Sequence, residues 1–388
     1  MKPLILSCAA LLSALLAFLT NWLALKPWRR AAVRHWSERA RLLFPVRRAA
    51  SSNLWVLPAV LSLGAWLALP EESPHWSLLL LASAFGAVAG TIPMDREIFP
   101  RIPLAEQIRQ CALAWVIRFV IWGVFLTAIA LMPDEFGGQA ILILLAVLLL
   151  LFFWSRSGWV WLCRWLGLFV KPPDRLLEIV RATAAKMNVM HGEVWLMRSP
   201  FALAYAMPGT RRLLFAERLL EVLRDDEISA VCAHELAHLT EKRSEYRIRY
   251  IGWLTFLPWI FLHPMIHCFG VPGFYVLIGI TVLAPRVQRG ISRRLEARAD
   301  SIAHANETES GVYARALARL YEDSLLPAVN AQRTATHPDL YDRLEGAGVT
   351  PDFPRPARPE KIAWHGTLFA LVLGFVAMLS ILKYLYDR

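Results

Sequence analysis

Long apolar stretches limit the possible folds of this chain more than any other feature. The chain has 388 residues, 56% of them hydrophobic, and a mean hydropathy of +0.42. A helix of about 20 apolar residues crosses a bilayer while satisfying its own backbone hydrogen bonds. Eight stretches approach this length, although the third, fifth and seventh are short: Leu4–Leu25, Leu54–Leu69, Trp76–Ile92, Cys111–Met132, Ala140–Trp154, Tyr250–Phe269, Val271–Ala284 and Ala363–Tyr384. The sequence therefore predicts a multi-span α-helical membrane protein.

Charged residues between these stretches predict their orientation. Residues 26–48 are rich in Lys and Arg, whereas the connections at Glu71-Glu72 and Asp134-Glu135 are acidic. Because Lys and Arg favour the cytoplasmic side, residues 26–48 are expected there. Counting alternate crossings places 172–249 and 286–361 on the same side and both termini outside. A cleaved signal peptide at Leu4–Leu25 is the alternative, but the stretch is long and the basic residues after it oppose translocation.

Net charge and cysteine content exclude two other classes. The net charge of +11 is explained by basic loops beside an anionic leaflet, so the expected partner is the lipid bilayer and no nucleic acid. The sequence has no Cys-x-x-Cys pair, which argues against a disulfide framework and a Cys-ligated zinc site. We expect small, buried, apolar roles for the five cysteines: Cys8, Cys111, Cys163, Cys232 and Cys268.

The pentad His234-Glu235-Leu236-Ala237-His238 predicts a metal site. Acidic residues at 225–227 and apolar residues at helical spacing indicate a helix, so both imidazoles lie on one face. Two histidines at this spacing can share a Zn2+ ion, and Glu235 can act as general base on a metal-bound water. The alternative is a chance match on a surface helix.

A third protein ligand is needed for catalytic zinc, and Glu296 is the candidate. Glu296 and Asp300 are four residues apart on one expected helix. Glu296 could bind the metal while Asp300 accepts the free ring N–H of His234 or His238. The alternative is an exposed charged helix on which Arg293, Arg294 and Arg298 pair with both acids.

Three ordered motifs together carry a family resemblance. The pentad 234–238 is followed by Glu296-x-x-Ala-Asp300 and then by His337-Pro338 and Arg343. This order resembles the CAAX prenyl protease and HtpX superfamily of integral-membrane zinc metallopeptidases, over Pro172 to Leu344. The resemblance implies a cytoplasmic, mainly α zincin-like domain of gluzincin type with a small β-sheet.

The resemblance also implies roles for residues outside the ligand set. His337 would lie near the metal and Arg343 near the reacting centre, as candidates for binding or transition-state stabilisation. The segment Leu203, Ala204, Tyr205 and Ala206 would be a strand edge that pairs with extended substrate. Leu203 replaces the usual Asn of this strand, and Ala237 stands where many members have Gly; neither change removes a ligand.

Local patterns predict the remaining elements and the domain division. Residues Asp174–Met187 form an amphipathic helix pattern, and three short strands are expected at Glu193–Arg198, Leu203–Met207 and Arg212–Phe215. The expected parts are a membrane region with about five spans (1–170), the first peptidase segment (171–249), a two-span hairpin (250–285), the second peptidase segment (286–362) and a last span (363–388). Because the ligands lie in both peptidase segments, these must assemble together.

A second pair of histidines, His263 and His267, receives a structural interpretation. The pair repeats the four-residue spacing of the pentad. It lies in an expected span and has no adjacent Glu, which favours packing or interfacial anchoring over a second metal site.

A tryptophan-rich segment precedes the expected peptidase part. Aromatic rings and basic side chains collect at the headgroup level of a bilayer. The segment is therefore expected to be interfacial and to lead into the peptidase part; its aromatic and basic residues are Trp159, Trp161, Trp165, Arg156 and Arg164.

The expected function is a membrane-embedded zinc metalloendopeptidase that hydrolyses membrane or membrane-associated polypeptides at the cytoplasmic face, for quality control or dedicated processing. We expect it in a bacterial inner (plasma) membrane. A BlaR-type sensor-transducer that cleaves a cytoplasmic regulator is the alternative, but it calls for an extracellular sensor domain, and none follows the last apolar stretch. A non-catalytic scaffold with a relic zinc site is the third class, which intact His234, Glu235, His238 and Glu296 oppose.

Overall fold

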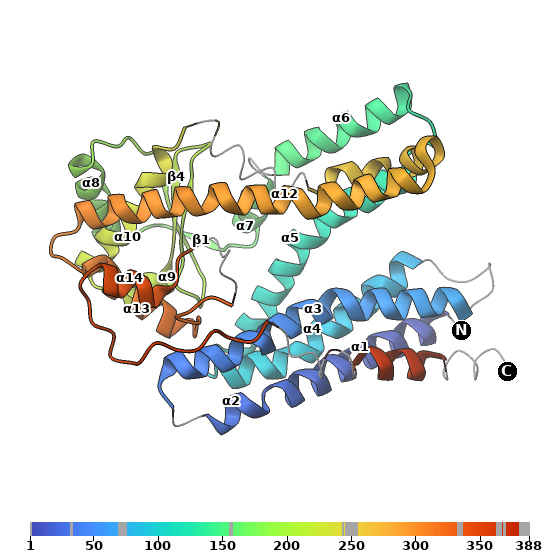
Figure 1. Cartoon of the computed structure of the whole chain (residues 1–388), viewed down its shortest axis with the longest axis horizontal. Helices are drawn as coiled ribbons and strands as arrows, with labels where there is room; N and C mark the ends of the chain where they lie inside the picture. Colours follow the sequence, from blue (N-terminus) through green and yellow to red (C-terminus); the bar gives the residue numbers. More distant parts are fainter. Residues whose placement is uncertain are drawn as a thin grey trace. The chain divides into compact units, whose positions relative to one another are not determined.

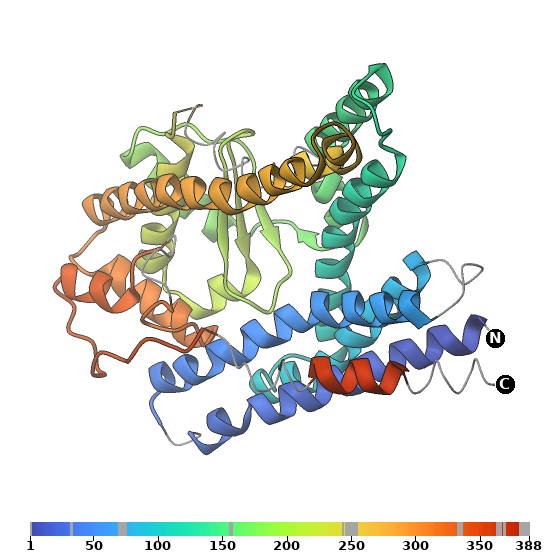
Figure 2. The same cartoon turned by 45° about the vertical axis from the view of Figure 1, so that its right-hand side comes forward.

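Helices make up most of the chain, and one small sheet accompanies them (Figures 1 and 2). The computed structural model describes residues 2–31, 34–68, 76–154, 158–242, 244, 255–331, 337–361, 367 and 370–379. Two units are distinguished by their internal contacts. Unit 1 comprises Met1–Cys111, Leu325–Gln332 and Phe353–Arg388, and unit 2 comprises Ala112–Ser324 and Arg333–Asp352.

Unit 1 is a bundle of helices. Its elements are α1 (Lys2–Ala24), α2 (Lys26–Arg30), α3 (Trp36–Ala68), α4 (Trp76–Ile98) and the start of α5 (Leu104–Leu131). Glycines allow α1 and α4 to lie very close together. A Cβ atom on Gly86 would lie only 2.0 Å from the Ala10 carbonyl oxygen, and a Cβ atom on Gly90 only 2.2 Å from the Ala14 carbonyl oxygen. Small residues allow such close helix packing within a bilayer.

Several helices could cross a membrane. In the described part of the chain, three segments are long and apolar enough, and three apolar helices are shorter: Pro3–Arg30, Leu78–Ile98 and Leu257–Asn306, then Val120–Leu131, Gly138–Phe153 and Ala370–Leu379. The expected stretch Leu54–Leu69 lies in α3 as far as Ala68. Some residues of the other predicted spans, connections and the tryptophan-rich segment lie outside the described residues: 69–75, 156, 245–254, 362–366 and 380–388. The number and direction of crossings remain predictions.

In unit 2, α12 (Leu262–Asn306) follows a 3-10 turn, η2 (Leu257–Phe261), and bends sharply at Gly270 (φ 59°, ψ −146°). The chain doubles back there: the Trp259 indole N–H donates to Thr281 Oγ1 at 2.6 Å, and Gly273 leaves no room for a Cβ beside Met265. A positive φ favours glycine, which explains Gly270 at the turn. This turn lies between the two apolar stretches for which a hairpin is expected.

The hairpin packs against α5 and α6 (Gly138–Phe153). Ile260 is fully buried among Ile121, Phe125 and Val147. His263 Nδ1 lies 3.1 Å from the Met132 carbonyl oxygen, a contact that agrees with a packing role for this histidine. From this end α12 runs on toward the helices of the metal centre, as Figure 1 shows.

The cysteines are only partly as expected. All five are free thiols; Cys163 and Cys232 are buried, whereas Cys8 and Cys111 are partly exposed. The prediction of a buried Cys268 is wrong, because this side chain is exposed close to the point where the hairpin turns at Gly270.

The sheet has four strands in the order β1-β2-β4-β3: β1 (Phe169–Val170), β2 (Val194–Met197), β3 (Ala204–Met207) and β4 (Arg212–Ala216). β2 and β4 are parallel, and the other pairs are antiparallel. The three predicted strands and the predicted helix, α8 (Asp174–Lys186), match within one residue at each end. β1 is not predicted; it lies before residue 171, where the peptidase part is expected to begin. β3 forms one edge of the sheet.

Helix α10 (Asp225–Leu239) is the centre of unit 2. It contacts α8, α12, α13 (Val312–Asp323) and β3, and 12 of its 15 residues are buried. Two shorter helices, α9 (Glu217–Val222) and α14 (Leu340–Gly346), pack against β4 and α13 respectively. A helix buried on nearly all sides can hold polar side chains only where these find partners, so the polar residues of α10 mark the functional site.

Candidate metal centre

The start of α10 is fixed by a buried carboxylate. Glu227 Oε2 accepts a hydrogen bond from the Arg224 backbone N–H at 3.0 Å and another from Arg319 Nη1 at 3.0 Å. The first contact caps an otherwise unpaired backbone donor, and the acidic first turn stabilises the helix dipole. These contacts fix the rotation of α10, and with it the direction in which His234 and His238 point.

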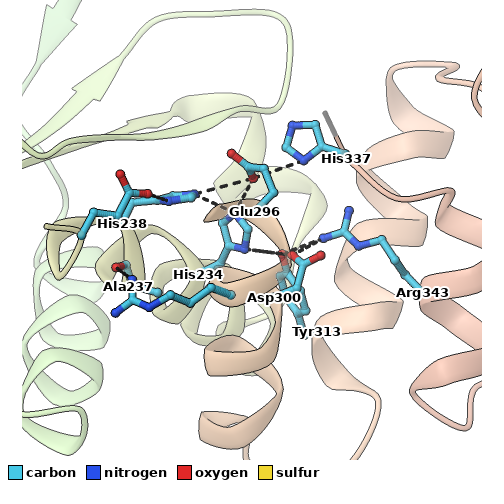
Figure 3. A network of polar contacts seen from close by, with 10 residues as sticks. His234, Ala237, His238, Glu296, Asp300, Tyr313, His337 and Arg343 are labelled. Atoms are coloured by element: carbon cyan, nitrogen blue, oxygen red, sulfur yellow. Dashed lines mark hydrogen bonds and ion pairs between the residues drawn. The ribbon is translucent and has the colours of Figure 1, made fainter. Parts of the chain in front are cut away.

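Three possible ligand atoms converge between α10 and α12 (Figure 3). His234 Nε2 lies 3.2 Å from His238 Nε2, and Glu296 Oε2 lies 3.5 Å from the first and 3.7 Å from the second. Around a tetrahedral zinc with bonds of about 2.0–2.1 Å, neighbouring ligand atoms lie about 3.3–3.4 Å apart. The triangle of His234, His238 and Glu296 therefore fits a zinc ion without rearrangement.

The charge of the site also favours a cation. Burial opposes protonation of His234, but hydrogen bonds to Asp300 and Glu296 outweigh it and raise its pKa to about 9. The pKa of His238 is raised in the same way, against burial, by Glu241 and Glu296. Burial opposes ionisation of Glu296, yet the two imidazoles hold its pKa well below the usual range. A site that attracts protons so strongly is equally suited to a metal cation.

His234 is supported by residues from three other elements. Its Nδ1 lies 3.1 Å from Asp300 Oδ1 and 2.7 Å from the Tyr313 hydroxyl. The hydroxyl donates to Asp300 at 2.9 Å and lies 2.9 Å from Arg343 Nη2, which donates to Asp300 at 2.5 Å. Because the hydroxyl has one proton, given to Asp300, it accepts from His234 and Arg343. The Nδ1 atom then keeps its proton as the donor, and a metal ion would displace the second proton, which the raised pKa places on Nε2.

His238 is supported by its own chain segment. Its Nδ1 lies 2.6 Å from Oε1 of Glu241, three residues further on, whose side chain is almost fully buried. By the same argument Nδ1 of His238 keeps its proton, and Nε2 is the atom that would bind the metal. Arg298 of α12 donates to Thr240 Oγ1 at 2.7 Å and to the Ala237 carbonyl oxygen at 3.5 Å, which joins α12 to the end of α10.

The structure brings most predicted site residues together. Asp300 contacts His234, as one of two predicted possibilities. His337, whose side chain is 51% exposed, places Nδ1 at 3.2 Å from Glu296 Oε2. Arg343 is buried and contacts Asp300 and Tyr313, not one of the three ligand atoms. Glu235 lies next to His234 on α10 and is 8% exposed.

The predicted substrate segment Leu203 to Ala206 comprises the residue before β3 and the first three residues of β3, the edge strand that lies against α10. Tyr205 is exposed and Ala206 is buried, as expected for alternating faces of a strand. One edge of β3 pairs with β4. No other strand in the described part of the chain pairs with β3.

Two contact residues were not predicted. Glu241 has a local signal, because a carboxylate three residues after a helix-end histidine can reach its ring. Tyr313 has none, since it enters from α13, 79 residues after His234 in the chain. The predicted alternative, in which arginines of α12 pair with both acids, is not what forms at Asp300: Arg343 from α14 takes that place.

Two histidines and a glutamate on one helix, with a second carboxylate from another helix within reach, have the arrangement of a metallopeptidase site of the zincin class. The comparisons agree: residues 171–348 match the model of peptidase family M48. This match and the relatives below confirm the predicted superfamily for residues 171–348, which are similar to metallopeptidase domains.

Three relatives are named as protease HtpX homologs. A protease HtpX homolog of Picrophilus torridus is 43% identical over 67 residues, 16% of this chain and 22% of its own length. Protease HtpX homolog 2 of Saccharolobus solfataricus is 29% identical over 155 residues, 34% of this chain and 48% of its own. A protease HtpX homolog of Saccharolobus islandicus is 29% identical over 160 residues, which are 35% of this chain and 48% of its own length. The chain thus spans less than half the length of these relatives. No solved structure matches.

Proposed function

We propose that the protein is a membrane-embedded zinc metalloendopeptidase that cleaves membrane or membrane-associated polypeptides at the cytoplasmic face. The observation that carries this proposal is the convergence of His234, His238 and Glu296 into one buried triangle, with Glu235 beside it on the same helix. The match of residues 171–348 to peptidase family M48 supports the same chemistry.

In this proposal His234, His238 and Glu296 hold the zinc ion. A zinc ion in such a site lowers the pKa of water and polarises the substrate carbonyl group. Asp300 and Glu241 orient the two imidazoles through their Nδ1–H groups, so that each Nε2 lone pair points into the triangle. Tyr313 and Arg343 in turn hold the Asp300 carboxylate in place.

Glu235 is assigned the proton transfers. Its carboxylate is not part of the ligand triangle, so it is free to take a proton from the attacking water and to pass it to the leaving amine. His337 lies beside the proposed ligand Glu296. In this proposal its ring binds the carbonyl oxygen that becomes negatively charged during the reaction. The burial of Arg343 favours a positioning role through Asp300 over direct contact with substrate.

Substrate binding is assigned to the edge of β3. An extended polypeptide could add to this edge through backbone hydrogen bonds, from about Leu203 to Ala206, and would then run alongside α10. Backbone pairing positions the peptide bond but depends little on the substrate sequence, so any side-chain preference would come from the side chains around Tyr205 and Ala206. Leu203 offers no side-chain hydrogen bond where relatives of this type have Asn, so substrate contacts there would be apolar.

The cytoplasmic location rests on charge asymmetry. Basic residues follow the apolar part of α12, at Arg286, Arg289, Arg293 and Arg294, as they follow α1. Both basic segments would lie on the same side as the metal centre. Reporter fusions after Val170 and Lys361 should read cytoplasmic, and a fusion after Arg388 should read external.

The two other classes have less support. The relatives that match are named as protease HtpX homologs, which does not favour a BlaR-type sensor-transducer. A scaffold with a relic site would not need the tautomers of both histidines to be fixed by buried carboxylates.

The deciding experiment is Glu235→Gln in the full-length protein, with zinc content and peptide cleavage measured on the same preparation. The amide keeps the size of the side chain but cannot accept the proton, so cleavage should fall by about 10²–10⁴-fold while zinc stays bound. Glu309→Gln, at an exposed position, is the matched control. A zinc-loaded Glu235→Gln protein that cleaves at the wild-type rate would exclude the proposed mechanism.

A further inference from the structure

The short helix α7 (Trp159–Trp165) presents two large aromatic side chains to the outside of unit 2. Trp161 and Trp165 are 67% and 72% exposed, and they lie four residues apart on one face. The opposite face is buried, with Val160 at 7% and Cys163 at 1%. Two exposed tryptophans on one face of a helix are costly in water, because each leaves a large apolar ring unburied.

The buried face fixes α7 to the sheet. Val160 packs with Trp195 of β2 and Leu214 of β4. Cys163 packs with Leu113 of α5 and with Leu168. The Arg164 guanidinium stacks over the Trp195 ring, 5.4 Å from its centre. Any surface that holds the outer face of α7 therefore also holds the sheet and α10, against which the sheet packs.

The preceding helix indicates what that surface is. α6 has 16 residues, none of them charged, and its apolar side chains point outward: Leu142, Leu149 and Phe153 are 68%, 69% and 61% exposed. An apolar helix exposed in this way is covered by lipid. At 1.5 Å per residue α6 extends about 24 Å, close to the roughly 30 Å thickness of a hydrocarbon core. A helix of this length that crosses the core has its two ends near the two membrane boundaries, and α7 follows the C-terminal end of α6 in the chain.

We propose that α7 lies in the headgroup region of the lipid bilayer, with Trp161 and Trp165 as its anchors. Indole rings favour this region because their flat body is apolar and their N–H is polar. Arg164, which is exposed between the two tryptophans, adds attraction to anionic headgroups. Because the other face of α7 is packed on the sheet, the helix holds the sheet at a fixed depth beside the membrane surface.

This placement has a consequence for substrate choice, which rests on the proposed peptidase function. A sheet edge held beside the bilayer would meet polypeptide segments within a few residues of a membrane anchor more often than segments free in solution. Substrates tethered to the bilayer would then be cleaved in preference to the same sequence without a tether.

Photo-crosslinking tests the placement without using catalysis. The full-length protein, in nanodiscs of phosphatidylglycerol and phosphatidylethanolamine, would carry benzoylphenylalanine at position 161 or 165. Position 190 is the control, since Met190 is 77% exposed but lies on a loop after α8. We expect phospholipid adducts at 161 and 165 and none at 190. Absence of lipid adducts at both positions, or adducts to a second copy of the chain or to another polypeptide, would overturn the proposal.

The fixed depth has its own test. The variant Trp161→Glu/Trp165→Glu should lower the ratio of kcat/KM for a bilayer-tethered peptide to that for the untethered peptide by roughly tenfold, because two negative charges are repelled from the anionic surface. Trp161→Phe/Trp165→Phe should restore the ratio. An unchanged ratio in the Glu variant contradicts the fixed depth, whereas absence of cleavage in the wild type contradicts the proposed function and leaves the crosslinking result decisive for α7.

Discussion

The surroundings of the two histidines of α10 differ in how they are built. His238 receives a carboxylate from its own segment, through Glu241 three residues later. His234 receives its partners from far along the chain: Asp300 from α12, Tyr313 from α13 and, through both, Arg343 from α14. In each histidine Nδ1–H is the donor to a supporting side chain, and Nε2 faces the other ligand atoms of the triangle. The same chemical result is therefore reached once by local spacing and once by tertiary assembly.

The contacts of the two histidines should differ in how easily they are disrupted. The support of His238 persists as long as the end of α10 keeps its turn. The hydrogen bonds of His234 depend on the packing of four helices, so they form only when the two peptidase segments have assembled. Substitutions around the two rings should therefore differ both in metal affinity and in stability.

The largest effect is expected at the residue that serves both rings. Glu296→Gln replaces a charged ligand by a neutral amide, and both imidazoles lose the carboxylate that Oε2 brings within 3.5 and 3.7 Å. Zinc affinity should fall by more than about 100-fold, beyond the range of losses for residues that only support ligands. Competition with a chromophoric chelator measures it, and the exposed Glu309→Gln is the control. A variant that retains wild-type affinity would remove Glu296 from the ligand set.

Asp300→Asn should have the next largest effect. It weakens the bond to His234 Nδ1 and leaves the buried Arg343 guanidinium without its charged partner. Zinc affinity should fall by about 10–100-fold, and the free energy of unfolding of the metal-free protein by about 1–3 kcal/mol, because a buried charge loses its hydrogen-bonded partner.

Both quantities would be measured on one preparation, by chelator competition and by chemical denaturation. Asp342→Asn, on the exposed side of α14, is the matched control for the Asp-to-Asn change. A loss of affinity without any loss of stability would show that Asp300 acts on the ring alone and not on the assembly of the four helices.

Glu241→Gln should be milder on both counts. The amide oxygen can still accept from His238 Nδ1, so the orientation of the ring is kept and only the charge is lost. Zinc affinity should fall by about tenfold, near the lower end for such partners, with the free energy of unfolding nearly unchanged. If Glu241→Gln lowers zinc affinity as much as Asp300→Asn does, then the contribution of a supporting residue to zinc affinity does not depend on how many elements hold the histidine.

The same division explains what the sequence could predict. Periodicity and capping residues predicted α8, α10 and three strands, because these depend on neighbours within one element. Motif spacing predicted the metal triangle of His234, His238 and Glu296 as a set of ligands. The two-residue strand β1 was missed, since it forms only because β2 offers a free edge.

Long-range packing decided what the sequence left out. No spacing rule connects Tyr313 with His234, and the burial of Arg343 behind Asp300 depends on where α14 docks. The exposure of Cys268 follows from the sharp turn at Gly270, which hydropathy does not report. The membrane orientation and the five-part division of the chain remain predictions.

The smallest effect is expected for Tyr313→Phe, which sharpens the comparison most. The ring stays packed against His234, with centres 5.6 Å apart and planes at 22°, so only the hydroxyl is lost. His234 Nδ1 can still donate directly to Asp300 Oδ1, 3.1 Å away. Of the three hydrogen bonds that the hydroxyl makes, one joins it to His234; one hydrogen bond contributes about 0.5–1.5 kcal/mol, so zinc affinity should fall by up to about tenfold. The d–d absorption of the cobalt-substituted protein should shift if the His234 ring reorients.

Tyr321→Phe is the matched control, because Tyr321 interacts with Arg343, and among the described residues no hydrogen bond joins it to His234. Equal changes in the two variants would mean that Tyr313 acts through Arg343 and not on the histidine.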